Sequence, residues 1–254
     1  MLEGKVVVVT GGAGSLGASI CNGIAREGGI PVVTDVDIDR AEKVAGDIRA
    51  SGFNAHAVAL DITNGTQIDQ VIVGVRDRFG RVDAVVNNAY PRGRNFGRPV
   101  EDVEYKDFCE SLSLHLGGYF LVSQKFAIAF RSQGFGNIVN ISSIYGLVAP
   151  VFELYEGTSM TMPVEYAAIK AGVVNLTRYF AQYYRRDGLR CNAVAPGGIR
   201  DGQPEVFMSR YDAMCGKKGL LDATDFVGTV TFLLSDASKY MTGQVLTVDD
   251  GWSL

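Results

Sequence analysis

The sequence predicts an α/β protein in which helices cover both faces of a doubly wound parallel sheet. Three observations lead to this prediction. Short β-branched runs alternate with helical patterns along all 254 residues. The first run is apolar at consecutive positions, Val6 to Val9, as in strands that are buried on both faces. Glycine or polar residues follow the runs, and such sheets bind ligands beyond the carboxyl ends of their strands.

The elements are expected to follow one another as one domain spanning residues 1–254. Strands are expected at 5–10, 30–34, 55–60, 82–86, 137–141, 190–194 and 244–248. Helices are expected from the first glycine loop to about residue 26 and at 38–50, 67–79, 105–130, 164–186 and 224–234. No proline- or serine-rich linker, low-complexity run or repeat interrupts this alternation, so a second domain is not predicted.

Composition excludes several classes of function. The net charge is −4, which argues against a nucleic-acid partner. Four scattered cysteines without a C-x-x-C motif, and only two histidines, predict free thiols in a reducing cytoplasm and no metal site. No apolar run approaches the ~20 residues that span a bilayer. The start of the chain leads directly into a strand, so we expect neither a signal peptide nor a membrane partner.

A glycine motif lies between the first strand and the first helix. Gly12, Gly14 and Gly17 satisfy G-x-G-x-x-G in this context. The missing side chains let the backbone approach a pyrophosphate, and the helix N-terminus supplies N–H donors and a positive dipole. The sequence therefore predicts a dinucleotide-binding domain of the Rossmann type.

The second strand ends at Asp35, 18 positions after Gly17. At this distance an acidic residue is expected to bond the adenine ribose. Asp37 fits the N-cap of the following helix better. Because no basic residue lies in the glycine loop or directly after Asp35, we expect NAD in preference to NADP.

Tyr166 and Lys170 lie four residues apart at the start of a predicted helix, and therefore on one face of it. A free phenol has a pKa of about 10 and is a poor base at neutral pH. We expect the nearby ammonium to lower that pKa, so that Tyr166 exchanges a proton with a carbonyl or alcohol oxygen. A packed tyrosine beside a solvated lysine is the alternative.

Seven motifs together resemble the short-chain dehydrogenase/reductase family over nearly the whole chain. They are Thr10-Gly-Gly-Ala-Gly-Ser-Leu-Gly17, Asp61, Asn87-Asn-Ala89, Ile141-Ser-Ser143, Tyr166-x-x-x-Lys170, Asn192-x-x-x-Pro196-Gly197 and Thr242-Gly-Gln-Val-Leu-Thr-Val-Asp249. The resemblance implies that Ser143 bonds the substrate oxygen, Tyr166 is the acid or base, and Lys170 binds the nicotinamide ribose. The cofactor site it implies comprises Gly11, Gly14, Ser15, Leu16, Gly17, Asp35, Asp61, Ile62, Asn88, Tyr166, Lys170, Pro196, Gly197 and Ile199.

Some positions depart from the family pattern. His115 stands where the family has an asparagine that relays protons, so we include His115 among the candidate catalytic residues, with a core histidine as the alternative. Tyr90 replaces a glycine and is expected to face the substrate. Ser15 replaces a glycine of the loop. Asp201 replaces a threonine that contacts the carboxamide.

Two segments are candidates for recognising the substrate. The segment between Ser143 and Tyr166, which contains Tyr155, is longer than the family usually shows, and we expect it to face the substrate or an oligomer partner. Arg92, Arg94 and Arg98 occupy the loop 91–99, which suggests an anionic substrate such as a sugar phosphate, a nucleotide sugar or an acid sugar. A solvated loop is the alternative.

The combined prediction is an NAD(H)-dependent oxidoreductase acting on a secondary alcohol or ketone of a small, polar, anionic substrate that resembles a sugar. One alternative is a reductase of 3-oxoacyl thioesters, and another is a catalytically silent protein that senses NAD or acts as a scaffold. The family includes members from bacterial surface-sugar and flagellin-modification pathways, to which the chain is loosely similar. Resemblance also implies a homotetramer, or a homodimer, built on the helices near 105–130 and 164–186.

Overall fold

The computed structural model describes residues 1–254 and contains one seven-stranded sheet. All neighbouring strands are parallel, in the order β3-β2-β1-β4-β5-β6-β7. The strands are β1 (Val6–Thr10), β2 (Ile30–Asp35), β3 (His56–Ala59), β4 (Ala84–Asn87), β5 (Gly136–Ile141), β6 (Leu189–Pro196) and β7 (Val245–Val248). The order reverses its direction between β1 and β4, which confirms the predicted doubly wound sheet.

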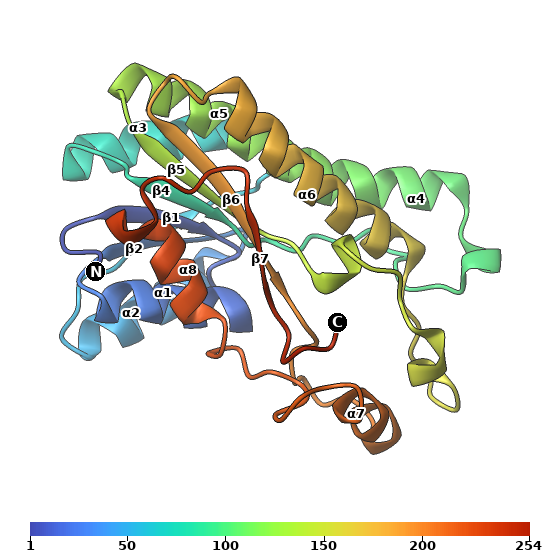
Figure 1. Cartoon of the computed structure of the whole chain (residues 1–254). Helices are drawn as coiled ribbons and strands as arrows, with labels where there is room; N and C mark the ends of the chain where they lie inside the picture. Colours follow the sequence, from blue (N-terminus) through green and yellow to red (C-terminus); the bar gives the residue numbers. More distant parts are fainter.

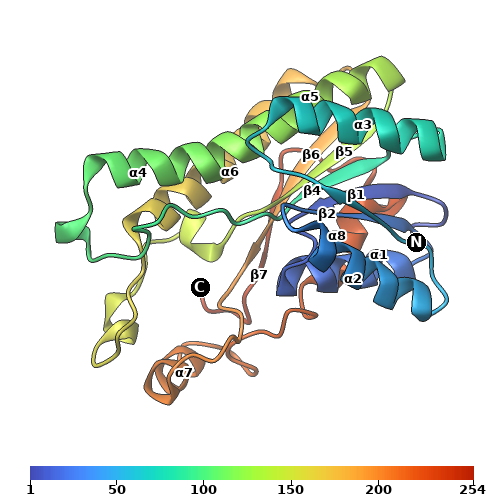
Figure 2. The same cartoon turned by 180° about the vertical axis from the view of Figure 1, so that it is seen from behind.

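Helices cover both faces of the sheet (Figures 1 and 2). They are α1 (Ser15–Arg26), α2 (Ile38–Ala50), α3 (Gly65–Phe79), α4 (Tyr105–Leu112), α5 (Gly118–Gln133), α6 (Val164–Tyr183), α7 (Glu205–Asp212) and α8 (Val227–Leu234). Helices α1, α2 and α8 lie on one face, and α3, α5 and α6 lie on the other. None of the helices combines the length and the apolar character that crossing a membrane requires.

The side chains of β1 explain how one strand serves two cores. All five residues of β1 are buried. Val6 and Val8 pack in the core beneath α3, α5 and α6, whereas Val7 and Val9 pack in the core beneath α1, α2 and α8. Successive side chains of a strand point to opposite faces, so a strand covered on both sides must be apolar at every position.

The helix expected at 105–130 differs from the prediction. It contains a π turn, Ser113–Gly117, between α4 and α5, and the backbone remains helical at both junctions. Such turns insert one residue into a helix and occur frequently at functional sites. This turn carries His115, so that the side chain sits at a local widening of the helix.

A third core cluster lies away from the two faces of the sheet. It joins the long segment after β5 to α7, a helix that the sequence did not predict. Phe207 and Tyr211, four residues apart on α7, pack with Tyr155 and Trp252 in this cluster. Figure 1 shows α7 and the segment after β5 standing out from the body of the sheet, on the side where the C-terminus lies.

Candidate active site

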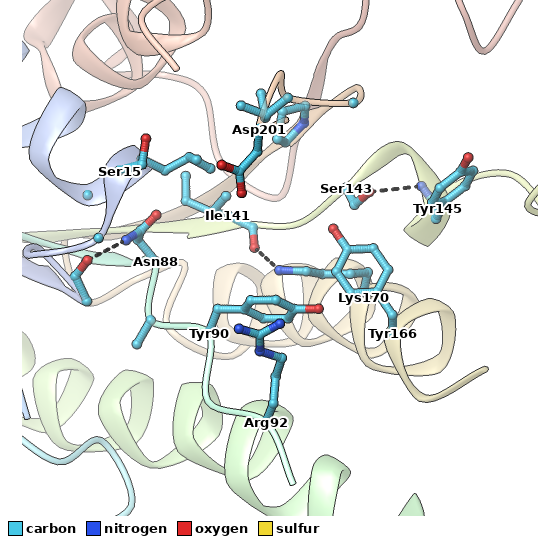
Figure 3. A pocket seen from close by; sticks show the side chains of 18 of the residues that line it. Ser15, Asn88, Tyr90, Arg92, Ile141, Ser143, Tyr145, Tyr166, Lys170 and Asp201 are labelled. Carbon is cyan, nitrogen blue, oxygen red and sulfur yellow. Dashed lines mark hydrogen bonds between the residues drawn. The ribbon is translucent and has the colours of Figure 1, made fainter. Parts of the chain in front are cut away.

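A cavity of about 740 Å³ lies at the carboxyl ends of β1, β4, β5 and β6. The glycine loop borders one part of it, and the segment after β5 together with α7 borders another. The sheet order changes direction at this edge, which is where ligands bind in doubly wound folds. Figure 3 shows the side chains that meet here from the loop, from β5 and from α6.

The N-terminus of α1 borders the cavity, whereas the N–H groups of loop residues 12–14 are hydrogen-bonded within the protein. Gly14 caps α1 without any side-chain hydrogen bond, and the first turn of α1 contains no acidic residue. A side chain at Gly17 would place its Cβ 2.1 Å from the Gly11 carbonyl oxygen, and one at Gly11 would lie 2.7 Å from the Cα of Ala89. The backbone contacts at Gly11 and Gly17 therefore leave no room for a side chain at either position. The exposed N-terminus of α1 fits a pyrophosphate.

Asn88 holds this loop in place. Its side-chain Nδ2 donates to the carbonyls of Thr10 and Gly11, at 3.0 Å each. The hydroxyl of Thr10 in turn accepts from the backbone N–H groups of Asn88 and Ala89, at 3.0 and 3.1 Å. Asn88 lines the cavity as expected, but its amide donors are already bonded to the loop.

The two carboxylates expected at the adenine end both line the cavity. Asp35 accepts from the N–H groups of Ala13 and Asp37, at 3.3 and 3.2 Å. Asp61 lies beside Ile62 and accepts from the N–H and the hydroxyl of Thr63, at 2.8 and 2.7 Å. The remaining expected cofactor residues that line the cavity are Ser15, Leu16, Pro196, Gly197 and Ile199.

Arg40, the basic residue a helical turn beyond Asp35 in the sequence, reaches the adenine end of the cavity. It lies in the first turn of α2, and its Nη2 donates to the carbonyl of Ala13 at 3.1 Å. Both Arg40 and Asp35 line the cavity. The adenine end therefore contains one acidic and one basic group.

Ser143, Tyr166 and Lys170 meet at the centre of the cavity. Lys170 Nζ donates to the Ile141 carbonyl at the end of β5, at 2.9 Å, and lies 5.6 Å from the centre of the Tyr166 ring. Ser143 follows β5, and its Oγ accepts from the N–H of Tyr145 at 3.2 Å. In Figure 3 the Tyr166 hydroxyl points toward Ser143. The structure thus brings the three predicted residues together.

The expected lowering of the Tyr166 pKa is not found in the protein alone. Burial raises the pKa of Tyr166, and the hydrogen bond from Ser143 offsets only part of this rise. Burial also lowers the pKa of Lys170 to about 7. Because burial disfavours both charged forms, the pair rests close to neutrality. A phenol with a raised pKa is protonated at neutral pH, and it can donate that proton to a carbonyl oxygen.

His115 is fully buried and does not line the cavity. Its ring meets Tyr90 and Tyr119 edge to face, with centroids 5.1 and 5.0 Å apart, and neither ring nitrogen has a hydrogen-bond partner. Burial first, and then the charge of Lys170, hold the pKa of His115 well below its usual value. The ring of Tyr90 also meets Tyr166, at 5.8 Å. His115 therefore lies behind Tyr90, one ring away from the central tyrosine.

The arginines expected at the substrate end are distributed differently. Arg92 lines the cavity and stacks over the ring of Tyr90 at 5.1 Å. Arg94 and Arg98 lie outside the lining, and Arg98 faces Asp107 at 3.5 Å. Arg200, which the sequence argument did not select, lines the cavity. Of the three predicted arginines, only Arg92 is in position to meet a substrate.

Tyr155 lines the cavity as expected, and its hydroxyl is 3.2 Å from that of Tyr145. Helix α7 holds this part closed, because Arg210 Nη1 donates to the carbonyls of Glu153 and Glu156, at 3.0 and 2.6 Å. Helix α7 and its residues in the cavity lining were not predicted from the sequence. The i, i+4 spacing of Phe207 and Tyr211 was the available signal.

Comparisons with known proteins agree with this geometry. A family model described as enoyl-(acyl carrier protein) reductase matches residues 11–253. The chain is 40% identical over 257 residues to post-translational flagellin modification protein A of Campylobacter coli, covering 100% of both proteins. A gluconate 5-dehydrogenase from Burkholderia cenocepacia in complex with NADP and tartrate is 27% identical, with a TM-score of 0.87 over 99% of this chain and 96% of that one. An NAD⁺-bound xylitol dehydrogenase is 26% identical, with a TM-score of 0.87 over 98% of this chain and 99% of that one.

The first prediction concerns Tyr166. Tyr166→Phe removes the proton-donating hydroxyl, so we expect hydride transfer in a single turnover to slow at least about 100-fold, while cofactor affinity stays close to that of the wild type. Tyr179→Phe on the exposed face of α6, where Tyr179 is 60% exposed, is the matched control. Stopped-flow absorbance at the reduced nicotinamide band measures the rate of hydride transfer in both variants. A Tyr166→Phe rate within a few-fold of wild type contradicts the assignment.

The second prediction concerns the lowered pKa of Lys170. The folded protein releases the proton near pH 7, whereas the unfolded chain keeps it up to the ordinary value of 10.5. Between these values the unfolded state binds more protons, so this group makes stability rise with pH, by at most about 1.4 kcal/mol per pH unit. We expect denaturant unfolding from pH 7 to 9 to show that the free energy of unfolding of the wild type rises with pH relative to that of Lys170→Met. Parallel stability curves would show that Lys170 keeps its ordinary pKa.

Proposed function

The chain belongs to the short-chain dehydrogenase/reductase family, and from this premise we propose that it transfers a hydride between a nicotinamide cofactor and a secondary alcohol or ketone. The observation that carries this proposal is the meeting of Ser143, Tyr166 and Lys170 in a cavity that also receives the bare N-terminus of α1. The glycine loop fits a pyrophosphate and the central trio fits a reacting oxygen.

The protein groups have separate roles in this reaction. The cofactor supplies or accepts the hydride when it is bound. In the direction of reduction, the Tyr166 hydroxyl donates a proton to the ketone oxygen, and the Ser143 hydroxyl bonds the same oxygen as charge develops on it. Lys170, held at the end of β5 by the Ile141 carbonyl, keeps a donor beside the phenol and the cofactor ribose. At neutral pH the Tyr166 phenol carries the proton that this direction requires.

We propose a small, anionic, sugar-like substrate. Arg92 and Arg200 supply positive charge at the rim of the cavity, and the hydroxyls of Tyr145 and Tyr155 supply neutral hydrogen-bonding groups. Guanidinium groups bind carboxylates and phosphates with two parallel hydrogen bonds. The similarity to a gluconate 5-dehydrogenase in complex with tartrate supports a polar sugar acid or a related compound.

The favoured cofactor is NAD. The carboxylate of Asp35 is placed to accept from ribose hydroxyls, and a 2′-phosphate there would meet a like charge. Arg40 on the same side of the cavity weakens this preference, since it offers a partner for a phosphate. Similar structures contain either cofactor. We therefore propose a preference for NAD(H) that depends on the balance between Asp35 and Arg40.

Reduction of a 3-oxoacyl thioester is the second candidate function, and the 32% identity over 252 residues to a 3-oxoacyl-[acyl-carrier-protein] reductase of Staphylococcus epidermidis supports it. The apolar part of the cavity, which contains Phe207 and Leu220, would accept an acyl chain. A silent NAD-sensing protein is the third candidate, but it would have no need of the complete trio of Ser143, Tyr166 and Lys170. Screening hydride transfer over 5-ketogluconate, sugar phosphates, nucleotide sugars and acetoacetyl thioesters with both cofactors separates the three. Turnover of thioesters alone would replace our proposal, and no turnover of any ketone would favour the silent protein.

We also propose that the chain forms a homotetramer, or a homodimer, in the cytoplasm. Large side chains are exposed along α4, α5 and α6, namely Tyr105, Phe120, Ile128, Tyr179 and Tyr183. Exposed large side chains on neighbouring helices are typical of a surface that a partner covers. The four cysteines are free, but only Cys21 and Cys191 are buried as expected, whereas Cys109 is exposed and Cys215 is half-buried. Free thiols are typical of a reducing compartment. Sedimentation velocity measures the association directly, and a monomer at micromolar concentration would contradict it.

The third prediction tests the arginines. Arg92→Gln and Arg200→Gln should each raise KM for an anionic ketone such as 5-ketogluconate about tenfold or more, because each removes a charged hydrogen bond. Arg94→Gln is the matched control, since Arg94 shares the loop but lies outside the cavity lining. Steady-state kinetics against a neutral ketose completes the comparison. An equal rise in KM for the charged and the neutral substrate would argue against anion recognition.

The fourth prediction tests the cofactor balance. Wild type should bind NADH at least about tenfold more tightly than NADPH, a difference of roughly 1.4 kcal/mol. Arg40→Gln should weaken NADPH binding and widen the gap, whereas Asp35→Ala combined with Val36→Arg should narrow or reverse it. Fluorescence titration of the reduced cofactors measures each affinity. Equal or tighter NADPH binding by the wild type would mean that Asp35 does not select the cofactor.

A further inference from the structure

Asp201 brings a negative charge into the catalytic half of the cavity. Three carboxylates line the cavity, and two of them, Asp35 and Asp61, follow β2 and β3 at the adenine end. Asp201 follows β6 instead. In Figure 3 it enters the cavity between Ser15 and Ser143, and its carboxylate points toward the centre. Asp201 is therefore the only lining carboxylate in the half of the cavity that contains the catalytic trio.

A short turn fixes the position of Asp201. Before the turn, the N–H of Arg200 donates to the carbonyl of Leu221 at 2.8 Å, which ties this segment to a neighbouring one. Within the turn, Gln203 bonds both sides. Its Oε1 accepts from the N–H of Asp201 at 2.8 Å, and its Nε2 donates to the carbonyl of Ile199 at 2.7 Å. The protein therefore sets the position of Asp201 before a ligand binds.

The carboxylate of Asp201 has no partner within the protein. It takes part in none of the ion pairs, and only the backbone N–H of Asp201 forms a hydrogen bond. The neighbouring Arg200 directs its Nη1 to Met208 Sδ on α7, at 3.4 Å. Burial lowers the pKa of Lys170 to about 7, so this amine carries only part of a positive charge at neutral pH. The charge of Asp201 is therefore free to act on a ligand in the cavity.

The geometry of hydride transfer puts the nicotinamide ring in the same part of the cavity. The two reacting carbons must approach to about 3–3.5 Å, and the acceptor carbon carries the oxygen that Ser143 and Tyr166 bond. The pyrophosphate fits the N-terminus of α1, so the ring lies between that helix and the catalytic trio. The reduced ring is neutral, whereas the oxidised ring carries one positive charge. A nearby carboxylate attracts only the oxidised form.

We propose that the Asp201 carboxylate stabilises the positive charge of the oxidised nicotinamide ring and so makes the bound reduced cofactor a stronger hydride donor. The inference rests on the proposed function. In reduction, the hydride carries two electrons and one hydrogen from the ring to the ketone carbon, and the oxygen takes the Tyr166 proton. The ring is left with one positive charge, which Asp201 faces. A fixed charge that is aimed at a developing charge lowers the barrier.

The charge of Asp201 distinguishes this role from that of a neutral side chain at the same position. The resemblance to the family implies a threonine here, whose hydroxyl can only form hydrogen bonds. A carboxylate forms hydrogen bonds too, but it also separates the affinities of the oxidised and the reduced cofactor. The ratio of these two affinities is therefore the quantity that tests the proposal, and measuring it needs no knowledge of the substrate.

Asp201→Asn removes the charge and keeps the size of the side chain. We expect its affinity for NAD⁺ to fall about tenfold, and its affinity for NADH to stay within about twofold of wild type, since two unit charges a few ångströms apart beside water attract by this amount. Glu205→Gln is the matched control, because Glu205 is exposed at the start of α7 and lies outside the cavity lining. Calorimetry and fluorescence titration measure the affinities, with NADP⁺ and NADPH in their place if the wild type binds these more tightly.

Cyanide gives a second readout. It adds to the reactive carbon of the oxidised ring, and the electron pair of the new carbon–carbon bond neutralises the ring as a hydride does. We expect NAD⁺ bound to Asp201→Asn to form this adduct about tenfold more readily than NAD⁺ bound to the wild type, because the charge that is lost is no longer stabilised. Absorbance of the adduct measures its formation constant at saturating NAD⁺.

Equal losses of NAD⁺ and NADH affinity in Asp201→Asn would reveal hydrogen bonding without a charge effect and would overturn the proposal. Unchanged affinities, or an unchanged formation constant of the cyanide adduct, would overturn it as well. In each of these cases the wild type still binds the cofactor, so the proposed function survives. A wild type that binds neither form of either nicotinamide cofactor would overturn the proposed function together with this inference.

Discussion

The attachment of α6 to the end of β5 is the contact on which the site depends. Lys170 joins the two elements twice, through its Nζ to the Ile141 carbonyl and through its own carbonyl, which accepts from the Ser142 hydroxyl at 2.9 Å. Gly146 permits this approach, since a Cβ there would lie 2.6 Å from the Lys170 carbonyl oxygen. A fixed helix on a rigid strand end places Tyr166 opposite Ser143, and the cofactor loop on β1 is positioned by the same sheet.

Burial at this junction sets the electrostatics of the site. The amine of Lys170 and the phenol of Tyr166 are both enclosed, so each is pushed toward its neutral form. An exposed lysine at the same spacing would instead stabilise a phenolate. The resting phenol is therefore ready to donate a proton rather than to accept one.

Local sequence patterns were sufficient to predict the sheet, and together with the family resemblance they predicted that Ser143, Tyr166 and Lys170 meet in one cavity. The glycine loop, Asp35 and the Tyr166–Lys170 pair each depend on short spacings within one strand, turn or helix. Features that depend on the reach of a side chain or on tertiary packing were missed or misplaced. The hydrogen bond from Arg40 to the Ala13 carbonyl spans 27 positions. Arg98 lies outside the cavity lining and faces Asp107, and α7 borders the cavity only through its contacts with the segment after β5. Predicting the lowered pKa of Lys170 also requires knowing that the side chain is buried, and residue spacing alone does not show this.

We propose that this cavity moves a hydride between a nicotinamide ring and a carbinol carbon. To test this, the protein is incubated with 5-ketogluconate, sugar phosphates and nucleotide sugars carrying ketones, together with NADH deuterated at the reactive carbon, and the masses of the products are measured by mass spectrometry. We expect an alcohol product that is heavier by one deuterium at the former carbonyl carbon, from at least one anionic ketone. Full retention of deuterium in the cofactor, with every ketone unreacted although NADH is bound, would contradict this proposal.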